Sequence, residues 1–214
     1  MEYLFCILIG YFIGAINPSF IIARLKGFDI REKGSRNAGA SNALINFGKV
    51  IGVLCAVFDI LKATGAIILA EKLFSGFENA FAVTAVACIV GHIFPFYMGF
   101  RGGKGLACLG GAILAFDIRV FAVMLAAEIA IVLLSDYICF VPMTASVAFP
   151  IVFAVMESNV TGAIILCIAT AMILLKHVEN IKRIKSGREM HFSYLWNKKS
   201  ETERITAAED ESRS

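Results

Sequence analysis

Charge is scarce in this sequence of 214 residues, of which only 17% are charged and 58% are hydrophobic. A soluble domain averages about 45–50% apolar and about 25% charged residues. The chain therefore lacks the polar residues with which a soluble protein covers its surface. Its apolar residues come in long blocks rather than at amphipathic spacing. These features predict an all-α polytopic membrane protein with a single domain of packed helices.

Metal and redox motifs are also missing. The six cysteines are scattered, with no more than one in or beside any apolar block, and without a Cys-x-x-Cys pair or a partnering histidine. We interpret them as reduced, buried thiols that pack as small apolar residues, rather than as disulfides or zinc ligands. The polar clusters described below contain no carboxylate pair and no credible set of metal ligands. We therefore expect neither a metal nor another cofactor.

Seven apolar blocks are expected to cross the membrane, since a crossing takes about 20 residues. Glu2 precedes the first block, whereas lysine and arginine follow the first and the last. Because cytoplasmic loops carry the excess of basic residues, this pattern places the N-terminus outside and the C-terminus in the cytoplasm. The predicted spans are residues 3–23, 50–69, 81–98, 106–116, 120–134, 140–156 and 161–175. The fourth is short and rich in glycine, so we expect it to be tilted, broken or only partly crossing.

Two regions are distinguished along the chain. Residues 1–196 are predicted to form one transmembrane domain. Residues 197–214 are polar and mixed in charge, and are expected to form a disordered cytoplasmic tail.

The first polar cluster is the stretch GSRNAGASN, residues 34–42, directly before the second span. A helix cap needs one serine or asparagine. This stretch has four such residues, which favours a polar pocket beside the membrane. The candidate site residues are Ser35, Arg36, Asn37, Gly39, Ser41 and Asn42.

The second cluster is FRGGKG, residues 100–105, between two apolar blocks. Glycine lets backbone N–H groups approach a ligand, and successive N–H groups form an anion-binding concavity. A phosphate cradle and an ordinary basic loop with glycines for close helix packing both fit these residues. A nucleotide-binding Walker A loop is excluded, because Gly105 follows Lys104 where a serine or threonine is required, and Met98 replaces the first glycine. The candidates here are Arg101, Gly102, Gly103, Lys104 and Gly105.

Ionisable residues also occur inside two predicted spans. Asp59 and Lys62 lie three residues apart on one helical face, and we interpret them as a structural ion pair that supports the site. His92 lies in the third span, close to the second cluster in sequence. Its position fits a packing residue and a site residue equally well.

The third cluster is KHVENIKR, residues 176–183. If the last helix continues, His177 and Asn180 share one face at i, i+3. A basic flank that attracts anionic lipid is the alternative, but it does not need a histidine or an asparagine. The candidates are His177, Asn180 and Arg183.

All three clusters fall on the cytoplasmic side of the predicted topology. They share cations, hydroxyls, amides and glycines. Such groups suit the binding of phosphate and the stabilisation of charge in acyl or phosphoryl transfer.

These clusters, in this order, resemble the motifs of the bacterial membrane glycerol-3-phosphate acyltransferases that use acyl phosphate. The first resembles GSGNxGATN. Residues 91–105 resemble GHxFPxFxxFKGGKG, and residues 176–189 resemble RHxxNIxRLxxGxE. Asp59 and Lys62 also resemble that family's DxxKG. The likeness runs from about Tyr3 to Glu189 and leaves the tail outside.

The resemblance implies seven transmembrane helices in the cell membrane, with the site facing the cytoplasm. It implies transfer of a fatty acyl group to the 1-hydroxyl of glycerol 3-phosphate, giving lysophosphatidic acid and phosphate. Ser35, Lys104, His177 and Asn180 match positions that the family associates with activity, and the glycines of the second motif match its glycerol-3-phosphate site. The implied partners are glycerol 3-phosphate, acyl phosphate, the lipid bilayer and the enzyme that forms acyl phosphate. No nucleic acid is implied.

Three residues depart from the family pattern. Arg36 replaces a glycine and Ser41 replaces a threonine, whereas Ile45 replaces an arginine associated with activity. Losing a desolvated cation from an anionic site costs a few kcal/mol, about 2–5 in related charge pairs. We hypothesise that Arg36 restores this charge from another direction.

Two other functions fit the same residues. An organic-phosphate transporter explains the helices and the basic cradle, but transport sites usually lie near the midplane between inverted repeats, and no such repeat is visible. A weakly active or inactive lipid-phosphate binder needs only the basic flanks. It leaves the Ser/Asn/Gly cluster unexplained.

Overall fold

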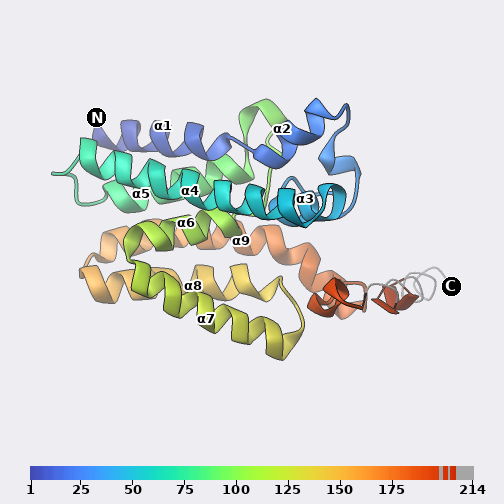
Figure 1. Cartoon of the computed structure of the whole chain (residues 1–214). Coiled ribbons are helices and arrows are strands. Elements are labelled where there is room, and N and C mark those ends of the chain that lie inside the picture. Colours follow the sequence, from blue (N-terminus) through green and yellow to red (C-terminus); the bar gives the residue numbers. More distant parts are fainter. Residues whose placement is uncertain (198–199, 202, 206–214) are drawn as a thin grey trace.

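The computed structural model describes residues 1–197, 200–201 and 203–205, and in this part the chain is helical without strands (Figure 1). The α-helices are α1 (Glu2–Ala15), α2 (Pro18–Leu25), α3 (Ala40–Phe47), α4 (Lys49–Leu73), α5 (Ala80–Ile93), α6 (Leu106–Phe116), α7 (Ile118–Ser135), α8 (Phe140–Glu157) and α9 (Val160–Lys185). Three short 3₁₀ helices are η1 (Ile30–Glu32), η2 (Phe96–Met98) and η3 (Phe192–Leu195).

Five of these segments are long and apolar enough to cross a membrane, and the pair α1–α2 makes a sixth if it is counted as one bent span. The five are α4, α5 together with η2, α7, α8 and α9, whereas α6 is a shorter apolar helix. This agrees with an integral membrane protein. The count of seven crossings and the orientation of the termini stay predictions.

The first predicted span is broken in the structure. Its two helices meet at 40°. Asn17 has an extended backbone, its side chain accepts a hydrogen bond from Phe20 N, and Pro18 follows at the first helical position. These are the features of a new helix start, because proline lacks an N–H and asparagine caps the exposed donors.

Other helix ends differ from the predicted spans for similar reasons. The third span was expected to continue to Met98, but α5 ends at Ile93 because Pro95 cannot continue a helix, and the chain resumes in η2. The last span was expected to end at residue 175, but α9 continues to Lys185. Asp117 begins α7 by accepting from Arg119 N and Val120 N.

Glycines allow the central helices to approach closely. A Cβ atom at Gly14 of α1 would lie 2.1 Å from Cys88 O of α5. A Cβ at Gly111 of α6 would lie 2.2 Å from Ile60 O of α4. Small residues serve this purpose in membrane helix bundles, where packing drives association.

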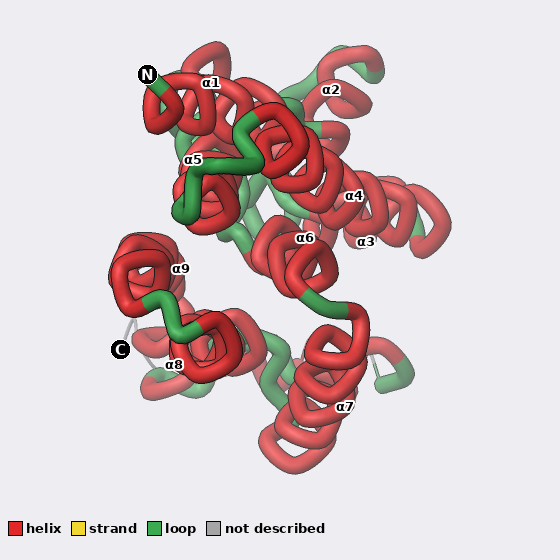
Figure 2. The backbone as a smooth tube through the Cα atoms, turned by 90° about the vertical axis from the view of Figure 1, so that its left-hand side faces the viewer, coloured by secondary structure: helices red, strands yellow, loops and turns green. Residues whose placement is uncertain are grey.

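The helices form a bundle in which α1, α4 and α5 lie on one side of α6 and α9, while α7 and α8 lie on the other (Figures 1 and 2). The main core contains Ile89, Leu109 and Phe149 from three of these helices. Large apolar side chains are exposed all around the outside, as expected where lipid is the solvent. In α7 only Glu128 and Val132 are buried.

The cysteines are all free, as expected, and five of them are buried. The expectation of burial is wrong for Cys167, which is exposed on the outer face of α9.

Candidate active site

The first cluster is organised by Asn42, whose side chain is completely buried. Its Nδ2 lies 2.8 Å from Ile30 O and 2.8 Å from Asn37 O, and its Oδ1 accepts from Ser35 N at 2.9 Å. A Cβ on Gly34 would lie 2.3 Å from the same Oδ1. Asn42 therefore shapes the loop, and leaves the side chains of Ser35 and its neighbours at the surface.

The remaining candidates of this loop differ in exposure. Ser35, Arg36 and Ser41 are exposed, Asn37 is half-buried and Gly39 is buried at the start of α3. Arg36 has a positive φ of 57°, a conformation uncommon for a residue with a side chain. Ile45, which departs from the family pattern, is 40% exposed.

The second cluster folds back over the end of α5. Gly102 N donates to Ile93 O at 3.0 Å, and Gly103 N donates to His92 O at 3.0 Å. A Cβ on Gly103 would lie 2.0 Å from His92 Nε2, so only glycine fits there. Gly105 has φ +92° and ends the loop directly before α6. A Cβ on Gly102 would lie 2.2 Å from His92 O, so all three glycines are required by the geometry of the loop. The N–H groups of Gly102 and Gly103 are bound to backbone carbonyls, so these two do not form the expected phosphate cradle.

Beneath this loop lies a buried charge network. Asp59 and Lys62 form the predicted ion pair, with 2.6 Å between Oδ1 and Nζ, which confirms that expectation. Lys62 Nζ also donates to Ile16 O at 2.5 Å and lies 3.2 Å from His92 Nδ1. His92 is only 3% exposed and belongs to this network under the loop. It therefore supports the loop from below.

The donor atoms of Asp59, His92 and Cys108 lie within 4.8 Å of one another, a spacing that a metal ion can bridge. However, the Lys62 ammonium already neutralises Asp59 from 2.6 Å. A cation between these groups would be repelled by Lys62. The cluster is therefore explained as a structural ion network.

His177 and Asn180 of the third cluster lie on one buried face of α9, as predicted, because the helix continues past them to Lys185. His177 and Asn180 are 3% and 6% exposed. His177 Nδ1 lies 2.8 Å from Ile173 O. Because a carbonyl only accepts, Nδ1 carries the proton in the neutral ring, and Nε2 is left with a lone pair that can take a proton.

Asn180 joins the second and third clusters. Its Oδ1 accepts from Lys104 Nζ at 2.5 Å, and its Nδ2 donates to Glu189 Oε1 at 2.6 Å. Glu189 also forms an ion pair with Arg183, with 2.9 Å between Oε2 and Nε. Burial lowers the pKa of the Lys104 ammonium, and the nearby Arg183 lowers it further. Lys104 Nζ contacts the neutral amide oxygen of Asn180. An anion bound beside this ammonium would therefore be stabilised by its charge.

The first cluster is attached to the second through Arg31. Its guanidinium NH1 donates to Met98 O at 2.5 Å and to Arg101 O at 3.3 Å. Asp29 holds the guanidinium in place at 2.7 Å, and Arg31 in turn keeps the pKa of the Asp29 carboxyl low. Within residues 1–197, no hydrogen bond joins Ser35 to Lys104, His177 or Asn180.

Several of these residues were not identified from the sequence. Glu189 was noticed only as part of a motif, and its proximity to Asn180 depends on a turn after α9. Arg31 was counted only as a basic loop residue. Glu128 is 8% exposed inside α7, where Thr144 Oγ1 donates to its carboxylate at 2.7 Å. A lone carboxyl within an apolar span was the signal that could have found it.

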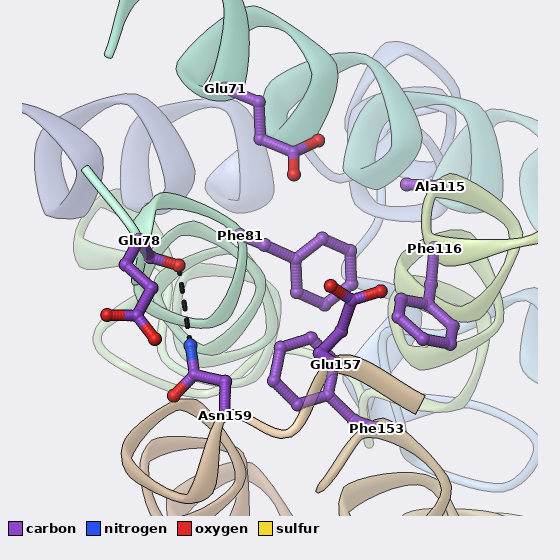
Figure 3. A pocket seen from close by; sticks show the side chains of 8 residues that line it. All are labelled: Glu71, Glu78, Phe81, Ala115, Phe116, Phe153, Glu157 and Asn159. Carbon is purple, nitrogen blue, oxygen red and sulfur yellow. Dashed lines mark hydrogen bonds between the residues drawn. The ribbon is translucent and has the colours of Figure 1, made fainter. Parts of the chain in front are cut away.

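A separate cavity of about 180 Å³ lies at the other end of the bundle, at the ends of α4, α6 and α8 (Figure 3). Glu71, Glu78 and Glu157 surround the rings of Phe81, Phe116 and Phe153 there. These three glutamates are exposed. The cavity is thus at the opposite ends of the helices that bear the three clusters, and its charge is unsuited to phosphate.

The fold and the cation-rich site define an integral membrane protein with a site suited to a phosphate-bearing ligand at one end of its bundle. A sequence model of the glycerol-3-phosphate acyltransferase family matches residues 4–187. The chain belongs to this family.

Individual relatives agree with this assignment. The chain is 38% identical over 188 residues to a glycerol-3-phosphate acyltransferase of Legionella pneumophila (strain Corby), covering 87% of this chain and 68% of the relative. Among solved structures, it is similar to PlsY (YgiH), an integral membrane glycerol 3-phosphate acyltransferase, in its glycerol 3-phosphate form. The TM-score is 0.82 at 32% identity, covering 91% of this chain and 98% of that one. The lysophosphatidic acid form gives a TM-score of 0.79 at 31% identity, covering 91% and 97%.

Proposed function

We propose that the protein transfers a fatty acyl group from acyl phosphate to the 1-hydroxyl of glycerol 3-phosphate, giving lysophosphatidic acid and inorganic phosphate. The family assignment supports acylation of glycerol 3-phosphate. The observation that best supports a common site is the 2.5 Å contact between Lys104 Nζ and Asn180 Oδ1, which joins the second and third clusters. We place this reaction at the cytoplasmic face of the cell membrane, where the predicted topology puts all three clusters.

The reaction requires no covalent enzyme intermediate, because acyl phosphate is a mixed anhydride with a good leaving group. The glycerol hydroxyl attacks the acyl carbon and forms the ester C–O bond. The bond between the acyl carbon and the phosphate oxygen breaks, and the electron pair leaves with phosphate. The hydroxyl proton goes to His177 Nε2 or to the departing phosphate, whose second pKa is about 6 by analogy with phosphoesters.

Each cluster has a separate task in this proposal. Lys104 and Arg101 hold phosphate charge, since donors placed where charge develops stabilise a transition state. The N–H groups of Gly102 and Gly103 do not take part, because they already donate to Ile93 O and His92 O. Asn180 holds Lys104, and His177 orients the acceptor hydroxyl. Ser35 and Asn37 donate to phosphate or to the developing oxyanion. Arg36 supplies the cation missing at Ile45, and Arg36→Gly is expected to lower activity more than a distant surface substitution.

Phosphate release by the purified protein in lipid nanodiscs tests this proposal. Palmitoyl phosphate is supplied with and without glycerol 3-phosphate, and lysophosphatidic acid is measured by mass spectrometry. We expect release to depend on glycerol 3-phosphate and to fall by about 10²–10³ in Lys104→Ala, as when one charge-stabilising donor is removed. Lys72→Ala, an exposed lysine near the end of α4, is the matched control and should retain activity.

Two outcomes would contradict the proposal. Phosphate release that is independent of glycerol 3-phosphate would identify a hydrolase. No release by a folded protein, combined with uptake of glycerol 3-phosphate into proteoliposomes, would establish the transporter instead.

A further inference from the structure

The chain after α9 folds back against the site. It turns at Gly187, where φ is +68°, and the N–H groups of Arg188 and Glu189 both donate to Arg183 O. This turn directs the Glu189 carboxylate onto Asn180 and Arg183. Only one residue, Asn180, then separates Glu189 from Lys104.

Arg204 fastens this turn from the other side. Its NH2 donates to Glu189 O at 2.7 Å, and its NH1 donates to Gly187 O. Glu201, which is only 6% exposed, holds the same guanidinium at 2.9 Å. One arginine thus binds two backbone carbonyls of the turn while its charge is neutralised by a buried carboxylate. Both residues lie beyond the part of the chain matched by the family.

The same segment is also attached to the turn between α7 and α8. Asp136 accepts from Ser193 N and from Ser193 Oγ, each at 2.8 Å. His191 Nε2 lies 2.9 Å from Tyr137 OH, and His191 Nδ1 lies 3.0 Å from Glu201 Oε1. The C-terminal clasp, residues 187–197, 200–201 and 203–205, therefore bridges the α7–α8 turn and the third cluster.

This arrangement determines how the Asn180 amide is turned. Glu189 accepts from Nδ2, so the amide oxygen faces the Lys104 ammonium. If the carboxylate moved away, the amide would be free to rotate and to present its NH₂ group, which repels an ammonium. We propose that Arg204 and Glu201 are positioning residues of the acyl transfer, acting through Glu189 and Asn180 on Lys104. The proposal rests on the function proposed above.

The first test is Arg204→Ala in the full-length protein. We expect kcat for glycerol-3-phosphate-dependent phosphate release to fall about tenfold, because small misplacements of a catalytic group cost up to about 10²-fold. Arg204→Lys should recover part of this loss, since an ammonium can bind one of the two carbonyls. Glu203→Gln, an exposed neighbour in the same helical turn, is the control and should behave as wild type.

A crosslink separates positioning from folding. Asp136→Cys and Ser193→Cys are joined with a short thiol-to-thiol reagent in a Cys167→Ser background, which removes the exposed native cysteine. We expect efficient crosslinking, and we expect the crosslink to restore most of the activity that Arg204→Ala loses. Ser193→Cys alone should give neither result.

The results are distinguishable from failure of the proposed function. If the wild-type protein shows no acyl transfer, the proposed function is wrong. Crosslinking of the two introduced cysteines would still show that the clasp forms. A fully active Arg204→Ala would overturn the positioning role. Inactivity of the crosslinked protein that retains Arg204 would do so too, because the clasp would then have to open.

Discussion

At the scale of single residues, the site depends on positions where a side chain is excluded. Gly103 is the sharpest case, because any Cβ atom would overlap the His92 ring. The ring is held in place on its other side, because Asp59 and Lys62 both contact His92 Nδ1. The glycine loop and the charge network therefore depend on each other.

Gly103→Ala is expected to displace the loop and with it Lys104. Activity should fall by about 10²-fold if Lys104 moves by about 1 Å. Initial rates of phosphate release and the melting temperature should be measured together. Gly65→Ala in α4 is the matched control, because a Cβ there meets no atom within 4 Å. Equal activity of the two variants would show that the loop tolerates displacement.

The sequence showed which residue types were present at the site, but not their partners. The pairing of Asp59 with Lys62 was predictable because both lie on one helix, three residues apart. The contact between Lys104 and Asn180 was not, because it spans 76 positions of the sequence. The functional motifs were recognised, whereas Glu189 acquired its partners only from the turn at Gly187.

At the scale of helices, the ion pair between Asp59 and Lys62 allows α4 to lie inside the bundle, because each buried charge compensates the other. Removing one partner of a buried pair leaves an uncompensated charge and costs about 3–5 kcal/mol. We expect Lys62→Met alone to lower the melting temperature in detergent strongly, and Asp59→Asn/Lys62→Met to recover much of the loss. Lys72→Met, an exposed lysine of the same helix, is the control. A double variant as unstable as the sum of its single variants would show that the two charges are not coupled.

Helix boundaries were predictable where composition changes abruptly. The prediction of residues 106–116 coincides with α6, which lies between Gly105 and Asp117. The bend after α1 was missed because Asn17 and Pro18 stand in an otherwise continuous apolar block. The short helix α3 was seen only as part of a polar cluster, since its eight residues are too few for a clear periodicity.

At the scale of the whole molecule, the three clusters and the acidic cavity lie at opposite ends of the bundle. The predicted orientation places the cavity outside and the clusters in the cytoplasm. Cysteines introduced at Glu78 and Glu157 should react with a membrane-impermeant maleimide in intact cells. Cysteines at Lys182 and Lys185 should react only after permeabilisation. The Cys167→Ser background removes the exposed native thiol. Labelling of all four in intact cells would contradict the topology.

The predicted tail begins at residue 197, but the structure extends the ordered contacts further. Glu201 and Arg204 have defined partners. Residues 198–199, 202 and 206–214 lie outside the described part, and the disorder expected for them stays a prediction. The division of the chain at residue 196 likewise stays a prediction.

The buried ion network also has a consequence for biogenesis. Lys62 binds Ile16 O and His92, Tyr11 OH donates to Phe94 O, and Tyr97 OH donates to Ala15 O. All these partners lie in the first half of the chain. The polar groups of α1, α4 and α5 can therefore be satisfied before α6 has left the ribosome. These three helices can therefore associate in the bilayer with their charges already compensated, before the later helices are added.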